Sequence, residues 1–460
     1  MNYALLTFLR RSAWILMPAL ILLSWGKKPA PPGLQVPVTY YKLGNGLKVV
    51  LSPDKTAPTI AVGVYYNIGF RIEPKNRTGF AHLFEHMMFQ GSENLGKMEF
   101  IQLVQKNGGI LNGSTRFDFT NYFEVMPAHK LETALWAEAD RMRGLKITQD
   151  NLTNQQGVVK NEVKVNVLNQ PYGGFPWLDM PQYANKNWYN AHNFYGDLAD
   201  LDSARLEDVD AFFKTFYAPN NAVLVVSGDF EVNDAKKWID QYFSKIPPSK
   251  LPPKPDLKEP AQEKEQRFTK EDKLAKKPAI AIGYKMPERN TPEYYAMGLI
   301  DQMLVQGQDS RLYQSLVQQK GYTSGVSGGI NIGLGNMFDY NGPMLWVSNL
   351  TYDASIPADS IIRQYDLAVS DLKNVTADDL KLAIVKMRSG LYDAMGGTFG
   401  IGKVNLLACF ALFDDNPAKI NTLESEFKKV TPELIRKTAQ KYLSAKNRTI
   451  LIIEPKPANS

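Results

Sequence analysis

The chain has 460 residues, of which 44% are hydrophobic and 22% are charged. This is the composition of a globular protein with room for two or more domains, and it excludes a largely disordered chain. The formal net charge of +6 is small for this length, and no block of lysine and arginine marks a nucleic-acid-binding surface.

The first residues have the pattern of a targeting segment. Arg10-Arg11 precede an apolar run from Ser12 to Trp25. The run contains Pro18 and is shorter than the roughly 20 apolar residues of a membrane span, which favours a signal peptide. The alternative is a retained membrane anchor with a Pro-rich tether. We therefore expect residues 1–33 to be one or the other, and the body of the chain to be exported, either periplasmic or membrane-anchored and facing the periplasm.

Three strands are predicted next. Val38–Leu43 and Leu47–Leu51 flank a Gly44-Asn45-Gly46 turn, which is a hairpin signal. Thr59–Tyr66 is rich in β-branched and aromatic residues, as expected of a buried strand.

A His-x-x-Glu-His motif follows these strands. No helix breaker interrupts the stretch from Phe80 to Gln90, and Thr78 can serve as an N-cap, so we predict a helix here. On a helix, His82 and His86 stand one turn apart on the same face, with Cβ atoms about 5–6 Å apart. Both imidazoles can then bind one metal ion, with Glu85 beside them.

This arrangement is suited to catalysis by zinc. Two imidazoles and a carboxylate from elsewhere in the chain would leave the fourth tetrahedral position open to water. Zinc lowers the pKa of that water towards 7, and Glu85 can take its proton. The alternative is that His82 and His86 are ordinary polar residues on a helix face. The chain has only four histidines, so two at this spacing around a glutamate favour the metal site.

The stretch Thr78–Gly91 resembles the zinc helix of the pitrilysin, or insulinase, family of metallopeptidases. The resemblance implies a third ligand, a glutamate on a later helix, and Glu162 stands at the matching distance from His86. We expect a helix from Thr148, a possible N-cap, through Val167. Relatives often carry a second glutamate seven residues before the ligand, where this chain has Gln155 and would lack that charge.

Further helices are predicted at Lys97–Lys106 and Leu131–Arg143, with an extended stretch between them at Ile110–Val125. The resemblance implies that this stretch is the edge strand beside the zinc, where a substrate peptide binds as an added strand. Asn112 and Gly113 match the family's Asn-Ala pair at that strand. A plain turn or bulge remains the alternative, because Asn-Gly is also a hairpin signal.

The last segments of the first half are expected to have structural roles rather than catalytic ones. The aromatic-rich loop Tyr172–Tyr195 is expected to cover the core. His129 and His192 have no metal-ligand spacing to a neighbour, so we interpret them as structural. A helix at Ala211–Tyr217 and a buried strand at Asn221–Asp229 complete this half.

A change of composition marks a domain boundary. Six prolines lie between Pro247 and Pro260, and the charged run Glu263–Lys277 follows. We predict a linker at residues 246–277. It would separate an N-terminal peptidase domain with the zinc site, residues 34–245, from a homologous C-terminal domain without that site, residues 278–460.

The second half repeats the first. The matching segments are Ala279–Tyr284 with Ile60–Tyr65, Asp301–Gly307 with Glu85–Gly91, and Lys446–Ile453 with Asn220–Ser227. In this alignment Gly298, Asp301 and Gln302 stand where the first half has its two histidines and its glutamate. The second copy therefore cannot form the same metal site.

The resemblance implies an α+β fold of two homologous domains, each a mostly antiparallel sheet packed with helices. In many relatives the second half, or that of a partner, presents an arginine and, seven residues later, a tyrosine to the substrate. Here Val317 and Ser324 occupy those positions, and the nearby Arg311 and Tyr322 are out of register. We hypothesise a dimer in which a homologous partner subunit, or a second copy, supplies the missing pair.

The sequence thus predicts a zinc endopeptidase that acts on short peptides or unfolded polypeptides, with one Zn²⁺ per chain. The expected ligands are His82, His86 and Glu162, and Glu85 is the expected catalytic base. The alternative function is a non-catalytic peptide-binding or assembly subunit of the same fold.

Overall fold

The computed structural model describes residues 35–397 and 400–456 of the chain. The segment 1–33, interpreted above as a signal peptide or an anchor, lies outside the described residues. Contacts between residues join the chain from Val36 onward into one compact unit. The division into two repeated domains with a linker therefore remains a proposal that rests on the internal repeat.

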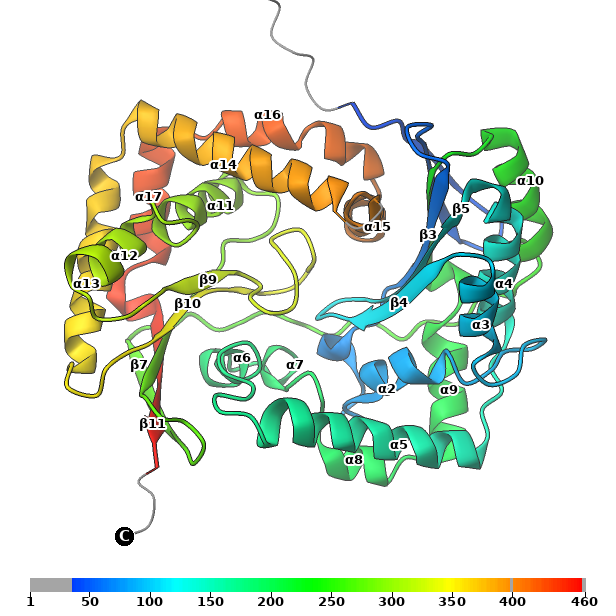
Figure 1. The fold of residues 1–460 in the computed structure, drawn as a ribbon, viewed down its shortest axis with the longest axis horizontal. Helices are drawn as coiled ribbons and strands as arrows, with labels where there is room; N and C mark the ends of the chain where they lie inside the picture. Colours follow the sequence, from blue (N-terminus) through cyan, green and yellow to red (C-terminus); the bar gives the residue numbers. More distant parts are fainter. Residues whose placement is uncertain (1–34, 398–399, 457–460) are drawn as a thin grey trace, which may run out of the picture. The chain divides into compact units, whose positions relative to one another are not determined.

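Two β-sheets form the framework of the chain, and the five strands of the second are arranged like five of the six strands of the first (Figure 1). The strands are β1 (Thr39–Lys42), β2 (Lys48–Pro53), β3 (Thr59–Tyr66), β4 (Ile110–Thr115), β5 (Thr120–Pro127), β6 (Ala222–Gly228), β7 (Gln266–Asp272), β8 (Ala279–Lys285), β9 (Ser327–Ile330), β10 (Leu345–Thr351) and β11 (Arg448–Pro455). The first sheet has the order β1-β2-β6-β3-β5-β4, and the second has the order β7-β11-β8-β10-β9. Each sheet has one parallel pair, which is β2 with β6 in the first sheet and β7 with β11 in the second. All other neighbouring strands are antiparallel. The predicted α+β fold is confirmed.

The helices of the described residues surround these sheets. They are α2 (Phe80–Met87), α3 (Glu99–Lys106), α4 (Leu131–Arg143), α5 (Gln149–Val163), α6 (Asp179–Ala184), α7 (Trp188–Ala191), α8 (Leu198–Asp202), α9 (Leu206–Phe216), α10 (Val232–Phe243), α11 (Pro292–Leu304), α12 (Arg311–Tyr313), α13 (Ala358–Asp371), α14 (Ala377–Gly396), α15 (Ile401–Asp414), α16 (Leu423–Lys428) and α17 (Pro432–Tyr442). None of these helices alone is long and apolar enough to cross a membrane. Only α14 and α15 taken together, meeting at 105°, reach that length and composition.

Helix α5 has the start that its sequence predicts. Thr148 is its N-cap, and the Thr148 hydroxyl accepts a hydrogen bond of 3.2 Å from the backbone N–H of Asn151. The helix continues into a π-helical turn at Lys164–Leu168, so the helical segment reaches past Val167 as expected. Glu162 therefore lies on a rigid element.

The main hydrophobic core lies between one face of the first sheet and helices α2, α4, α9 and α10. Alternate residues of β3, such as Val62 and Val64, point into this core, as the two-residue period of a strand requires. The other face of the sheet is covered by α15, which comes from the second half of the chain (Figure 1). Gly63 permits the close approach, because a Cβ atom there would lie 2.8 Å from Cγ1 of Val404.

The second sheet is covered in turn by a helix of the first half. Met180 and Ala184 on α6 join a buried cluster with residues of β8, β10 and β11. A Cβ atom at Gly283 of β8 would lie 2.6 Å from Cε of Met180. The aromatic segment 172–195 does cover a core, as predicted, but α6 within it covers that of the second half. Each half thus contributes one helix, α15 or α6, that covers a sheet of the other half.

Two boundaries differ from the predicted ones. The Pro-rich part of the predicted linker has neither helix nor strand from residue 247 to residue 263, but the charged run holds β7. Every second residue of β7 is exposed, so a charged sequence can pair with β11. The predicted extended stretch 110–125 is two strands, β4 and β5. They are joined by a turn in which the N–H of Arg116 donates to the carbonyl of Phe119 at 2.8 Å.

Candidate metal centre

Helix α2 carries the His-x-x-Glu-His motif, but it does not begin as predicted. Gly79, with φ of 80°, is the N-cap, and the carboxylate of Glu73 accepts the N–H groups of Gly79 at 2.9 Å and Ala81 at 2.6 Å. Thr78 is not the cap, because its hydroxyl donates to Asp200 at 2.6 Å instead. The first turn of the helix is therefore stabilised by a buried carboxylate that comes earlier in the chain.

Three side chains from two helices converge at this site. Oε2 of Glu162 on α5 lies 3.6 Å from Nε2 of His82 and 3.4 Å from Nε2 of His86, both on α2. One donor atom from each residue lies within 4.8 Å of the others. In tetrahedral zinc sites with bonds of about 2.0–2.1 Å, donor atoms are about 3.3 Å apart. The donor set and its spacing fit a zinc ion.

Burial prepares His82 for metal binding. Its side chain is 3% exposed, and burial lowers its pKa to about 4, so the imidazole is neutral at pH 7. Neutral imidazole is the form that coordinates metals. The ring packs against Phe194 with centroids 4.6 Å apart, and Nδ1 has no hydrogen-bond partner among the described residues. Nε2 is therefore the nitrogen of His82 that faces the other two donors.

Glu85 lies next to the cluster and has a separate partner. Its Oε2 accepts a hydrogen bond of 2.8 Å from Oγ1 of Thr115, the last residue of β4. Burial raises the pKa of the Glu85 carboxyl, against the lowering effect of that hydrogen bond. A carboxylate with a raised pKa is a better proton acceptor, which suits a general base.

Strand β4 is the edge strand of its sheet and lies against α2. A Cβ atom at Gly113 would lie 3.2 Å from Cγ of Glu85, so the absence of a side chain lets the strand approach the motif closely. Asn112 is exposed, and its Oδ1 accepts the N–H of Gly113 at 2.9 Å. Both predicted substrate-binding residues thus lie on the edge strand beside Glu85.

Residues that the sequence did not indicate also contribute to the site. Thr115 holds Glu85, Glu73 caps α2, and the hydroxyl of Tyr195 donates to Oε1 of Glu162 at 3.1 Å. Thr115 and Tyr195 lie 30 and 33 residues from their partners, and Glu73 lies in a separate turn six residues before Gly79, so no motif spacing marked them. Gln155, where relatives often have a second glutamate, is buried in α5.

The two remaining histidines lie outside the cluster, as predicted. His192 directs Nδ1 to the carbonyl of Trp188 at 3.1 Å and stacks on the indole of the same residue. His129 is exposed in a short turn before α4.

Comparisons with known proteins identify the family of the chain. Residues 48–187 match the family model described as insulinase, peptidase family M16, and residues 203–344 match the one described as peptidase M16 inactive domain. The chain belongs to the insulinase family.

Two solved structures share the fold of this insulinase-family chain, and a curated protein resembles part of its sequence. The zinc protease PqqE of Helicobacter pylori is 29% identical over 283 residues, which span 60% of this chain and 63% of that protein. The crystal structure of a protease from Helicobacter pylori has a TM-score of 0.84 at 23% identity and covers 92% of this chain and 100% of that one. The periplasmic protease PqqL from Escherichia coli has a TM-score of 0.72 at 17% identity, and 92% of this chain matches 48% of that one.

The second half of this insulinase-family chain does not reproduce the metal cluster. Within residues 35–397 and 400–456, the group of His82, His86 and Glu162 is the one set of three or more His, Cys, Asp or Glu side chains close enough to share an ion. On α11, Gly298 packs against Met337 and Asp301 is buried. Arg311 is held by Asp371, with Nε and Oδ2 2.9 Å apart.

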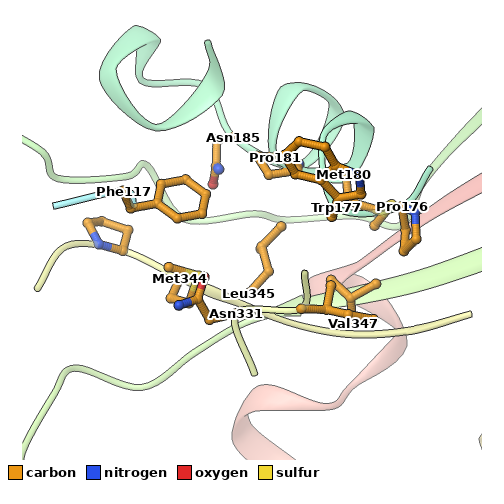
Figure 2. A pocket seen from close by; sticks show the side chains of 12 residues that line it. Phe117, Pro176, Trp177, Met180, Pro181, Asn185, Asn331, Met344, Leu345 and Val347 are labelled. Carbon is orange, nitrogen blue, oxygen red and sulfur yellow. The ribbon is translucent and has the colours of Figure 1, made fainter. Parts of the chain in front are cut away.

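A small apolar pocket lies between segments of the two halves, close to Trp177 (Figure 2). Its volume of about 20 Å³ is enough for one water molecule. The other wall includes Leu345 and Val347 of β10. None of the three converging side chains lines it, so this pocket is separate from the candidate metal centre.

Proposed function

We propose that this chain is a zinc-dependent endopeptidase that hydrolyses peptides or unfolded polypeptides. The observation that carries the proposal is the convergence of His82, His86 and Glu162 with Glu85 alongside. The name of the relative PqqE, a zinc protease, supports it. Family membership supports the reaction class in the same way.

Each of these residues would have a distinct role in peptide hydrolysis. His82, His86 and Glu162 would hold one zinc ion. A zinc ion bound there supplies Lewis-acid activation of water and of a peptide carbonyl. Glu85, fixed by Thr115, takes the proton of the attacking water and passes it to the leaving amine. Strand β4, with Asn112 and Gly113, binds the substrate as an added strand through main-chain hydrogen bonds, which tolerate many sequences.

The proposal includes a partner subunit. Val317 and Ser324 stand where many relatives present an arginine and a tyrosine, and Arg311 is already paired with Asp371. A homologous subunit or a second copy would supply the missing pair. The match of this chain to about half of PqqL is compatible with a site completed by a second two-domain unit.

We also propose that the chain is exported to the periplasm, in soluble or membrane-anchored form. This rests on the pattern of residues 1–33. The relative PqqL, which is a periplasmic protease, supports the same location.

One observation favours a second candidate function. The missing arginine and tyrosine, together with the match of residues 203–344 to a domain described as inactive, suit a subunit that binds extended peptides without cleaving them. The complete Glu85, His82 and His86 motif favours the enzyme.

The test compares the wild type with Glu85→Gln in zinc content and in cleavage of a quenched fluorescent peptide. We expect equal zinc content and a loss of turnover of about 10²–10⁴-fold, the usual contribution of a general base. Glu207→Gln, an exposed change on α9, is the matched control and should behave as wild type. Zinc without turnover in the wild type, with its partner present, would favour the binding function. Absence of zinc would contradict both the site and the enzyme.

A further inference from the structure

Among the described residues, Tyr195 is the one phenol that contacts the converging side chains at hydrogen-bond distance. Its hydroxyl donates to Oε1 of Glu162 at 3.1 Å, whereas Oε2 of the same carboxylate faces His82 and His86. The two oxygens of Glu162 therefore have different partners. A phenol is protonated at neutral pH and can act as the donor in this bond.

The backbone around Tyr195 is fixed against the start of α2. Gly196 has φ of 68°, and a Cβ atom there would lie 2.3 Å from the backbone nitrogen of Gly79. A Cβ atom at Gly79 would in turn lie 2.5 Å from the carbonyl oxygen of Tyr195. The N–H of Asp197 also donates to the hydroxyl of Thr78 at 2.8 Å. The backbone of Tyr195 and Gly196 is therefore packed closely against the start of the helix that carries the histidines.

The ring of Tyr195 is held as firmly as its backbone. The residue is 5% exposed. Its ring packs edge-on against His82, with centroids 5.2 Å apart, and against Phe194 and Trp177 at 4.9 and 6.1 Å. The hydroxyl is therefore a preorganised donor aimed at one oxygen of Glu162.

We propose that Tyr195 is a positioning residue of the metal centre, an inference that rests on the proposed zinc site. By binding Oε1 it holds the Glu162 carboxylate in the orientation that directs Oε2 alone to the metal position. A single oxygen from Glu162 leaves one coordination position free for water and substrate. Partners of this kind typically change metal affinity 10–100-fold when they are removed.

The role of Tyr195 also accounts for how Glu162 can be oriented although Gln155 replaces the second glutamate that relatives often carry. A neutral amide at that position adds no negative charge near Glu162. Orientation of Glu162 by a neutral hydroxyl needs no such charge. Glu162 is then held in place both by α5, on which it lies, and by Tyr195 in the segment after α7.

The experiment measures the zinc affinity of metal-free protein by competition with a chelator, for the wild type, Tyr195→Phe and Tyr183→Phe. Tyr195→Phe removes only the hydroxyl, and we expect zinc to bind about tenfold more weakly. Tyr183→Phe removes a hydroxyl from the same segment, where the ring packs against Phe268 with centroids 4.9 Å apart, and should bind zinc as the wild type does. Thermal unfolding of the metal-free proteins checks that the variants are folded.

A double-variant cycle distinguishes positioning of Glu162 from a general effect on the site. If Tyr195 acts through Glu162, the Tyr195→Phe change should cause no further loss of zinc affinity in a Glu162→Gln background. Wild-type protein without zinc would overturn the proposed function itself. Zinc bound equally by the wild type and Tyr195→Phe would overturn the role of Tyr195 and leave the proposed function intact.

Discussion

Asp301 occupies in the second half the position that Glu85 has in the first, but its hydrogen-bond partners are different and its pKa is raised. Oδ1 accepts the indole N–H of Trp346 at 2.7 Å, and Oδ2 accepts from Gln306 at 3.1 Å. No pair of histidines lies beside it, because the neighbouring positions are Gly298 and Gln302. Burial raises the pKa of Asp301 to about 7, so at neutral pH the side chain is partly a neutral acid.

This shift predicts a pH dependence of stability. Between about pH 4 and pH 7 the folded protein keeps a proton on Asp301 that the unfolded chain releases, so the free energy of unfolding falls as the pH rises. The loss from this group is at most about 4 kcal/mol. Asp301→Asn keeps the acceptor for Trp346 and removes the titration. Urea unfolding at several pH values measures the free energy of unfolding of both proteins. As the pH rises, this free energy should increase in the variant relative to the wild type. An equal dependence on pH in the two proteins would contradict the assignment.

At the scale of single elements, the start of α2 depends on Glu73. This buried carboxylate accepts two N–H groups of the first turn, and His82 lies in that turn. A change at Glu73 therefore acts on the fold and on the metal centre through the same few residues.

Glu73→Ala should lower the free energy of unfolding by about 2 kcal/mol, because two buried N–H groups lose their acceptor. Zinc affinity should fall as well, since the first turn of α2 no longer holds His82 firmly. Glu99→Ala is the matched control: Glu99 accepts the N–H of Gly96 in an exposed position at the start of α3, and its loss should cost about 0.5 kcal/mol. Equal costs for the two variants in urea unfolding would refute the special role of Glu73.

The elements predicted correctly are those whose signals are local. Helix α4 and strand β3 have the predicted bounds because their apolar periods and flanking residues lie within the segment itself. The start of α2 was predicted wrongly because its cap, Glu73, belongs to an earlier turn, and β7 was missed because a charged edge strand has no apolar pattern. The helix motif indicated His82 and His86, but Tyr195 approaches through a backbone contact that no sequence spacing encodes.

At the scale of the whole molecule, the dimer hypothesis makes a prediction about concentration. If a second copy supplies the arginine and tyrosine that this chain lacks at Val317 and Ser324, peptidase activity per chain should fall when dilution separates the copies. Sedimentation velocity and activity measured over the same dilution series would test this. If the partner is a different homologous subunit, the chain alone should be inactive and regain activity when that subunit is added. Full activity per chain in a solution of monomers would rule out both forms.

The exchange of α15 and α6 between the halves has a consequence for the half that lacks the candidate metal centre. Without residues 401–414, one face of the first sheet would expose its apolar residues to water, and without Met180 and Ala184 the second sheet would do the same. Deletion of either half should therefore destabilise the half that remains, because its sheet loses the helix that covers it. The half without the candidate metal centre is therefore an integral part of the scaffold of the half that carries it.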